Sequence, residues 1–137
     1  MSKDYSKQLV KDYKYWTLSV HSNQCYLGRC VVWCKRNDAL DMADATPDEQ
    51  KELFIILSEL RSALTKAFSP DWFNYGFLGN EMRHLHGHIV PRYSKPVTFK
   101  GVDFEDKLYG KHYRSDHAFK IPDEILFAIR DEIKKNI

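Results

Sequence analysis

The spacing of hydrophobic residues changes along this chain of 137 residues, from every second position near the start to every third or fourth in the middle. Trp16, Leu18 and Val20 alternate with more polar residues, and the run 29–34 is mostly apolar. Both segments are therefore expected to be strands. Leucines and a phenylalanine then recur at helical spacing over 53–68. This spacing predicts one long helix whose apolar stripe packs in the core.

The sequence also predicts where that helix begins and ends. Thr46 is a suitable N-cap, Pro47 suits the first helical position, and Glu49 completes a capping box. Ser69 and Pro70 end the apolar pattern. We therefore expect a helix that starts directly after Thr46 and stops near Phe68.

The two ends of the chain carry weaker signals. Residues 4–13 have apolar positions at helical spacing among lysines, which predicts a short amphipathic helix. Residues 93–121 are rich in aromatic residues and lysines and are expected to be irregular. A last helix is predicted from Pro122, with isoleucines on one stripe.

A strand-like aromatic segment, 72–77, and a loop at 78–83 lead into a run with histidine at every second position. His84, His86 and His88 are half of the six histidines in the chain. Alternate residues of a strand point to one face, so the three imidazoles are expected to form a row there. Imidazole nitrogens need hydrogen-bond partners and titrate near neutral pH, so such a row indicates a functional site.

Three uses of this row can be considered. Three histidines with an open fourth position resemble a catalytic zinc site, but alternate strand positions lie about 7 Å apart, which disfavours one shared ion. Alternatively, one imidazole attacks phosphorus while its neighbours hold the phosphate oxygens. A set of structural histidines on a polar sheet face is the third use. The pair Gly79-Asn80 and the positive charge of Arg83, just before the row, suit an anion site.

Composition narrows the class of protein. A chain of this length with 43% hydrophobic residues suits one domain, and a net charge of +2 is well short of a dedicated nucleic-acid binder. No apolar run has the length of a membrane span, and the first residues lack the apolar core of a secretory signal. We expect a cytoplasmic protein with no membrane or nucleic-acid partner. Cys25, Cys30 and Cys34 form no Cys-x-x-Cys pair and are expected to be buried free thiols.

The run His84-Leu85-His86-Gly87-His88-Ile89-Val90 resembles the defining motif of the histidine triad (HIT) family, in which three histidines alternate with apolar residues. Pro91-Arg92 follows it, as is common in that family. The resemblance covers about residues 15–95, and three further segments contribute to it: 28–36, 46–68 and 74–84.

This resemblance implies an α+β fold, with an antiparallel sheet of about five strands, a long central helix and a C-terminal helix. It implies a single HIT domain over 1–137, with a core at about 15–95 and a C-terminal extension at 96–137. The segment 96–110 resembles a tail found in a diadenosine tetraphosphate hydrolase-like subgroup. The family usually forms homodimers with a continuous sheet, so a homodimer is expected.

The resemblance also implies an activity. His86 would be the nucleophile that attacks the α-phosphate of a nucleotide, and His84 and His88 would orient it and hold the phosphate and leaving group. The implied enzyme is a hydrolase that releases a nucleoside monophosphate from a dinucleoside polyphosphate or a phosphoramidate through a nucleotidyl-histidine. It needs no cofactor and no protein-held metal, and Mg²⁺ would enter only on the substrate's phosphates. The alternative is a non-catalytic nucleotide-binding HIT protein.

Substrate contacts are implied at four further residues: Asn80, Asn74, Asn23 and His21. Asn80 falls where the family contacts phosphates and Asn74 where it contacts ribose, whereas His21 and Asn23 compete for the second ribose position. Two residues depart from the family pattern. Arg29 stands where many members have a fourth histidine, and Gly87 replaces a larger apolar residue, which is expected to weaken the strand.

Overall fold

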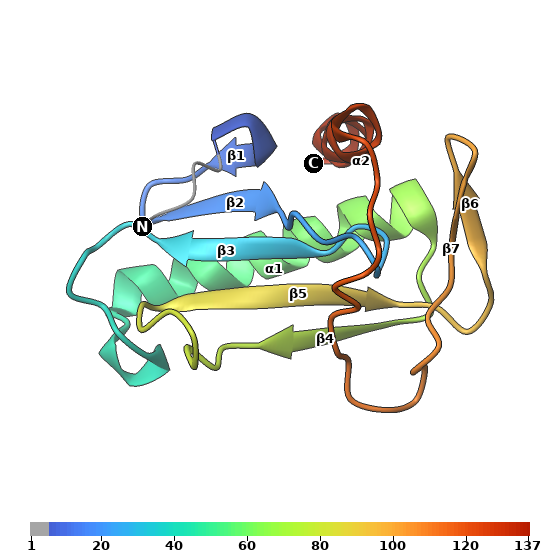
Figure 1. Cartoon of the computed structure of the whole chain (residues 1–137). Helices are drawn as coiled ribbons and strands as arrows, with labels where there is room; N and C mark the ends of the chain where they lie inside the picture. The colour runs from blue at the N-terminus through green and yellow to red at the C-terminus, as the bar shows by residue number, and fades with distance from the viewer. Residues whose placement is uncertain (1–5) are drawn as a thin grey trace.

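The computed structural model describes residues 6–137, which form an antiparallel sheet with helices packed on one face (Figure 1). Its spatial order is β1-β2-β3-β5-β4, and the strands are β1 (Leu9–Asp12), β2 (Trp16–Val20), β3 (Cys30–Cys34), β4 (Trp72–Gly76) and β5 (His86–Arg92). Helix α1 (Pro47–Phe68) lies behind the sheet in Figure 1, and helix α2 (Asp123–Asn136) packs against α1, β1 and β2. The expected fold class is confirmed.

The core lies between α1 and the sheet. Leu18, Val32 and Ile89 come from three neighbouring strands and are at most 1% exposed. Their partners on α1 are buried at helical spacing: Leu53, Ile56, Leu60, Ala63, Leu64 and Phe68. The prediction that the apolar stripe of this helix is core packing is therefore confirmed.

The ends of α1 follow the local sequence signals. The Thr46 side chain accepts a hydrogen bond from the Glu49 backbone N–H (3.2 Å), and the Glu49 carboxylate accepts one from the Thr46 N–H (2.8 Å). Ser69 adopts a left-handed conformation at φ 51° and ends the helix. Both predicted boundaries are confirmed.

The N-terminal segment differs from the predicted helix over residues 4–13. Residues Ser6–Gln8 form one short 3-10 turn, and residues 9–12 form strand β1, which pairs with β2. Residues 4 and 5 lie outside the described part of the chain. Only Leu9, Val10 and Tyr13 carried the helical pattern, and the hydrogen-bonding edge of β2 outweighs so weak a local preference.

The C-terminal extension is more ordered than the predicted irregular segment 93–121. Strands β6 (Val97–Phe99) and β7 (Val102–Phe104) form a separate hairpin. Lys100 and Gly101, at its tip, both have positive φ values, 51° and 80°. Such a two-residue turn closes an antiparallel hairpin tightly. Helix α2 follows at Asp123, as predicted.

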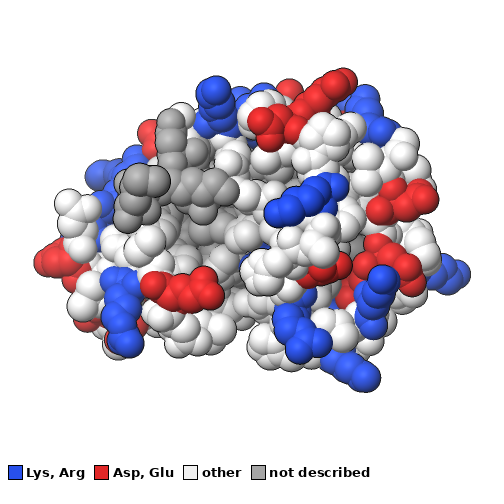
Figure 2. Space-filling view, in the orientation of Figure 1, with Lys and Arg blue, Asp and Glu red and all other residues white. Residues whose placement is uncertain are grey.

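All three cysteines are buried and free, which confirms their expected role as core thiols. Charged side chains of both signs are interspersed over the face drawn in Figure 2, and the middle of that face is largely uncharged. Neither helix in residues 6–137 combines the length and the apolar character needed to cross a membrane.

Candidate functional site

The face of the sheet opposite α1 carries the histidines. In the register of β3 with β5, Trp33 lies opposite His86 and Val31 lies opposite His88. His86 and His88 are both half-buried, and their ring centroids are 5.5 Å apart. Two of the three histidines therefore share one strand face, as predicted.

His84 does not belong to this strand, so the prediction of a three-residue strand row is wrong at this position. Strand β5 begins at His86, and residues 84 and 85 turn past the end of β3. The His84 Nε2–H donates to the carbonyl oxygen of Cys34 (2.6 Å), and its ring stacks on Trp33 with centroids 4.3 Å apart. These contacts with β3 outweigh the extension of strand β5 back to His84.

The contacts of His86 define which of its nitrogens is free to react. Its Nδ1 lies 2.7 Å from the carbonyl oxygen of His84. A carbonyl oxygen only accepts hydrogen bonds, so Nδ1 carries the proton and Nε2 of the neutral ring carries a lone pair. An imidazole held in this way can act as a nucleophile through Nε2.

His88 lies between a cation and two other imidazoles. The Nη2 of Arg29 is 3.4 Å from His88 Nδ1, and the rings of His86 and His21 lie 5.5 and 5.4 Å from its ring. Burial, the Arg29 guanidinium and the His86 ring lower the pKa of His88 from 6.5 to about 4. His88 is therefore neutral at physiological pH.

Arg29 is buried beside His88. It is 4% exposed, its Nη1 donates to the Ser115 hydroxyl (2.7 Å), and its guanidinium lies 5.7 Å from the Tyr113 ring centroid. Its Nε is buried without a hydrogen-bond partner, and within residues 6–137 it forms no ion pair. Burial lowers the pKa of the guanidinium. The sequence marked Arg29 as unusual but gave no sign of Tyr113 or Ser115.

The segment 105–121 crosses the open face of the sheet, in front of β4 and β5 (Figure 1). The backbone of Arg114 exchanges two hydrogen bonds of 3.0 Å with the Tyr26 hydroxyl. At Gly76, opposite His88 in β4, a Cβ atom would lie 2.6 Å from the Tyr113 hydroxyl oxygen. The C-terminal extension thus forms one side of the site.

The predicted substrate-binding residues differ in their surroundings. His21 joins the histidine cluster, and its Nδ1 accepts a hydrogen bond from the Asn23 N–H (2.9 Å). The Asn23 side-chain amide donates to the carbonyl oxygen of Asp116 (2.9 Å), and the Asn74 Oδ1 accepts from Arg92 (2.6 Å). Asn23 therefore binds the C-terminal extension, and Asn74 binds an arginine of the triad strand.

Asn80 is exposed in the loop before His84. Of the four predicted substrate-binding residues, the structure thus places only His21 beside a histidine of the triad, namely His88. The roles of all four residues stay predictions.

A cavity of about 640 Å³ lies between β4 and the extension, on the same face as the histidines. Asn74 and Gly76 line it from β4, whereas Tyr109, Lys111 and Tyr113 line it from the extension. Aromatic rings beside a lysine suit a ligand with a flat ring and a negative charge. None of the three triad histidines lines this cavity.

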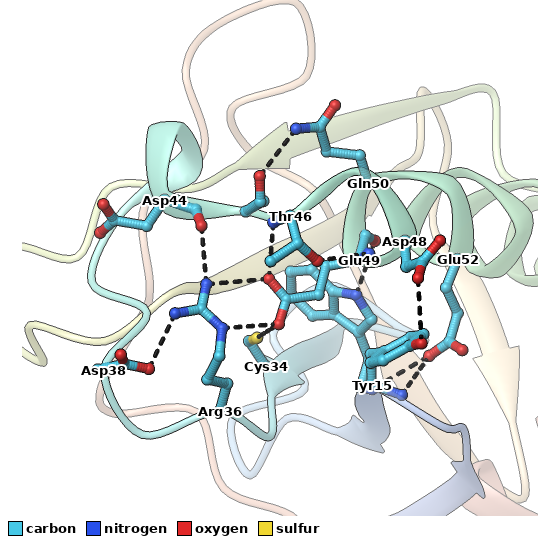
Figure 3. Close-up of polar contacts among 12 residues, drawn as sticks. Tyr15, Cys34, Arg36, Asp38, Asp44, Thr46, Asp48, Glu49, Gln50 and Glu52 are labelled. Carbon is cyan, nitrogen blue, oxygen red and sulfur yellow. Dashed lines mark hydrogen bonds and ion pairs between the residues drawn. The ribbon is translucent and has the colours of Figure 1, made fainter.

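An ion pair between the half-buried Arg36 and the buried Glu49 lies at the end of β3, next to Cys34 (Figure 3). Nε and Nη2 of Arg36 each lie 3.0 Å from an oxygen of Glu49, whose side chain is 3% exposed. The Arg36 hydrogen bonds are the main reason that the pKa of Glu49 falls to about 2. Cys34, whose carbonyl oxygen binds His84, places its sulfur 3.5 Å from the same carboxylate.

The donor groups of this site suit proton and phosphoryl chemistry. Within residues 6–137 no three His, Cys, Asp or Glu side chains are arranged to hold a metal ion. Nε2 of His84 and Nδ1 of both His86 and His88 already have hydrogen-bond partners. The imidazoles of His86 and His88 and the buried guanidinium of Arg29 lie side by side.

Several solved structures share this fold. A histidine triad protein from Sinorhizobium meliloti 1021 superposes with a TM-score of 0.72 at 19% identity, over 94% of this chain and 88% of that one. A hypothetical histidine triad nucleotide-binding protein from Sulfolobus tokodaii gives 0.69 at 16% identity, over 94% and 82%. The diadenosine triphosphate hydrolase of Plasmodium falciparum gives 0.67 at 13% identity, over 95% and 76%.

At these identities the solved structures establish the fold, and the sequence itself supplies the family. No curated protein matches the chain. A family model described as the HIT domain matches residues 3–95, which include the sheet, α1 and the three histidines. The chain is therefore a member of the HIT domain family.

Proposed function

We propose that this protein is a nucleotide hydrolase that forms a nucleotidyl-histidine on His86 and releases a nucleoside monophosphate. The observation that carries the proposal is the hydrogen bond from His86 Nδ1–H to the His84 carbonyl oxygen, which directs the lone pair to Nε2. Nucleotide binding is a property of the family. The substrate class we propose is a dinucleoside polyphosphate or a nucleoside phosphoramidate, as in a diadenosine tetraphosphate hydrolase-like subgroup.

The reaction proceeds in two displacements. His86 Nε2 attacks the α-phosphorus, and the bond from phosphorus to the leaving group breaks. Water then attacks the same phosphorus, and the bond to Nε2 breaks to release the monophosphate. The positive charge on the doubly substituted His86 ring is stabilised by its hydrogen bond to the His84 carbonyl oxygen.

The neighbouring histidines take different roles in this proposal. The His84 ring donates to Cys34 and stacks on Trp33, so His84 is a positioning residue that acts through its carbonyl oxygen. His88 contacts the phosphate or the leaving group. Asn80 contacts the phosphates, Asn74 one ribose, and His21 or Asn23 the other.

In the proposed reaction the protein supplies no cofactor, and Mg²⁺ enters only with the substrate's phosphates. The aromatic cavity between β4 and the extension is a candidate place for the leaving nucleoside.

We also propose a cytoplasmic homodimer. Strand β4 is an outer strand of the sheet, and an unpaired edge with exposed apolar residues favours pairing with another chain. Trp72 on β4 is 66% exposed and Phe54 on α1 is 68% exposed, and further exposed apolar residues lie near them: Ile55, Tyr75 and Leu78. Three buried free thiols suit a reducing compartment. Sedimentation of wild type and Trp72→Arg tests this proposal, because the variant should sediment as a monomer.

The alternative is a nucleotide-binding protein without turnover. One observation favours it: the side chains of Asn23 and Asn74, proposed to contact ribose, already bind Asp116 and Arg92. A ligand that used both amides would have to displace these contacts.

A steady-state assay separates the two functions. We expect wild type to hydrolyse diadenosine polyphosphates or adenosine phosphoramidates, and His86→Ala to lose activity about 10⁴-fold or more, as for other removed nucleophiles. His117→Ala, at an exposed histidine of the extension, is the matched control and should keep wild-type activity. If wild type bound adenosine monophosphate but cleaved none of these substrates, the non-catalytic function would be correct.

A further inference from the structure

The buried Arg29 is the feature of the site that the proposed mechanism leaves unexplained. A guanidinium that is 4% exposed normally faces a carboxylate, because an unpaired buried charge is costly. Within residues 6–137 it instead contacts the Ser115 hydroxyl, His88 Nδ1 and the face of Tyr113, all of them neutral groups. The positive charge is therefore directed at a histidine of the triad, and no carboxylate of residues 6–137 pairs with it.

We infer that Arg29 holds His88 as a neutral hydrogen-bond donor, and that this selects substrates whose leaving group departs as an anion. The favoured substrates are then phosphoanhydrides, such as dinucleoside polyphosphates, and phosphoramidates are disfavoured. This inference rests on the proposed hydrolase function, because it divides the two substrate classes that the proposed mechanism allows.

The hydrogen bond between the two residues defines the tautomer of His88. A guanidinium has only donors, so His88 Nδ1, 3.4 Å from Arg29 Nη2, is the acceptor. The neutral ring then carries its single proton on Nε2. A second proton on Nδ1 would remove this hydrogen bond and place two positive charges side by side.

The other surroundings of His88 favour the same neutral state. Its titratable neighbours are His86 on β5, His21 beyond the end of β2, and Tyr113 of the extension, which packs over Gly76 in β4. Within residues 6–137 no carboxylate forms a hydrogen bond or ion pair with His88. Burial, Arg29 and His86 together hold its pKa at about 4. All three of these influences disfavour the imidazolium form.

A neutral donor suits one leaving group and not the other. When His86 Nε2 attacks an anhydride, the bridging P–O bond breaks and its electron pair stays on the departing phosphate oxygen. That anion needs no proton, and the His88 Nε2–H can donate a hydrogen bond to it. In a phosphoramidate the P–N bond breaks, and the nitrogen must receive a proton before it leaves as an amine. A neutral imidazole N–H is a poor acid for that transfer.

The second step is the same for both substrates. Water attacks the nucleotidyl-His86, the P–N bond to the ring breaks, and its electron pair returns to Nε2 while one proton passes to solvent. Any difference between two substrates with the same nucleoside monophosphate therefore arises in the first step.

The kinetic test compares diadenosine tetraphosphate with an adenosine 5′-phosphoramidate of a primary amine. Because general acid catalysis contributes about 10²–10⁴-fold, we expect wild-type kcat/KM to be at least about 100-fold higher for the anhydride. Arg29→Gln keeps an N–H donor but removes the charge, and should reduce this preference about tenfold. Arg29→Lys keeps the charge and should preserve it. Lys66→Gln, which removes a charge from the exposed side of α1, is the control.

A second measurement does not depend on turnover. Nitrogen NMR of the imidazole rings, with His88 assigned from a His88→Gln variant, should show His88 protonated on Nε2 alone near neutral pH. Its titration in wild type should begin only well below the ordinary pKa of histidine, and in Arg29→Gln it should move to higher pH. These spectra would also show whether the variant is folded.

Each outcome bears on a different claim. Equal kcat/KM for the two substrates in wild type, or a proton on His88 Nδ1, would overturn the inference and leave the hydrolase function intact. Absence of turnover with both substrates would overturn the proposed function, and the substrate preference with it. If Arg29→Gln does not fold, the wild-type preference and the wild-type spectra still decide the question.

Discussion

Two arginines are buried on the open face of the sheet, and both contact the C-terminal extension, but their partners differ completely. Arg92 uses all five N–H donors, two of them on the buried carboxylate of Asp106 and the others on Asn74, Leu108 and Lys111. Among the described residues 6–137, Arg29 has no carboxylate partner, and its Nε is unpaired. Arg92, whose N–H donors are all used, holds the extension in place. Arg29, whose charge is not neutralised by a carboxylate of the described residues, can act on its neighbour His88.

The largest loss of stability should come from removing the Asp106 carboxylate, which pairs with Arg92. Asp106→Asn replaces an accepting oxygen by an amide donor next to the guanidinium, and both side chains of this ion pair are at most 3% exposed. We expect the free energy of unfolding to fall by about 3–5 kcal/mol, measured by urea titration. Asp103→Asn, at an exposed carboxylate on β7, is the control and should cost about 0.5 kcal/mol or less. Equal losses in the two variants would remove the contrast between the arginines.

A smaller loss is expected when Arg29 loses its one hydroxyl partner. Ser115→Ala leaves Nη1 without the acceptor at 2.7 Å while the charge stays buried. The free energy of unfolding should fall by about 1–3 kcal/mol, because an unsatisfied buried donor keeps its desolvation cost. Ser94→Ala removes an exposed hydroxyl that bonds to Asp71 and should cost less. If Ser115→Ala were neutral in urea titration, Ser115 would not contribute to holding the cation.

Removing the Arg29 charge altogether should cost less again. Methionine keeps much of the apolar volume and leaves no buried cation to solvate, so Arg29→Met should change the free energy of unfolding by about 1 kcal/mol or less. The matched variant Arg92→Met leaves the buried Asp106 carboxylate without its cation, so its loss in free energy of unfolding should be several times larger. A loss in Arg29→Met as large as in Arg92→Met, seen as equal shifts in the urea midpoint, would mean that both arginines are primarily structural.

The smallest effect concerns the pH dependence of stability. Burial and Arg29 hold the pKa of folded His88 at about 4, against 6.5 in the unfolded chain. Between these values the unfolded chain binds more protons, so the His88 contribution to stability is present above pH 6.5 and is lost as the pH falls toward 4. Arg29→Met should lose less stability over this range than wild type. The measurement is the urea midpoint of wild type, Arg29→Met and His88→Gln between pH 4 and pH 6.5. If Arg29 did not affect the pKa of His88, wild type and Arg29→Met would lose stability equally over this range.

The fold could be predicted where short stretches of sequence decide it. Thr46, Pro47 and Glu49 lie within four residues of each other and define the start of α1, so its N-terminus follows from local hydrogen bonding. Strand β1 could not be predicted in this way, because its four residues become a strand only by pairing with β2. The hairpin at 97–104 depends on the positive φ values of Lys100 and Gly101, and only the glycine signals such a turn.

In the candidate site, too, local patterns were predictable from the sequence and long-range contacts were not. The alternation of histidines placed His86 and His88 on one strand face, but His84 leaves the strand because Cys34, fifty positions earlier, accepts its hydrogen bond. The contact between Arg29 and Ser115 joins residues 86 positions apart. Neither contact follows a periodicity, so neither could be read from the sequence alone.

Gly87, which the sequence marks as a weak point of the triad strand, has a partner in space. A Cβ atom at this position would lie 2.2 Å from the Phe77 ring, so the phenylalanine occupies the volume that a larger residue at 87 would fill. A side chain at position 87 would therefore require the Phe77 ring to move or to be smaller. Among chains with this fold, substitutions at 77 and 87 should accordingly occur together, and a hybrid that exchanges only the loop or only the strand should fail to pack.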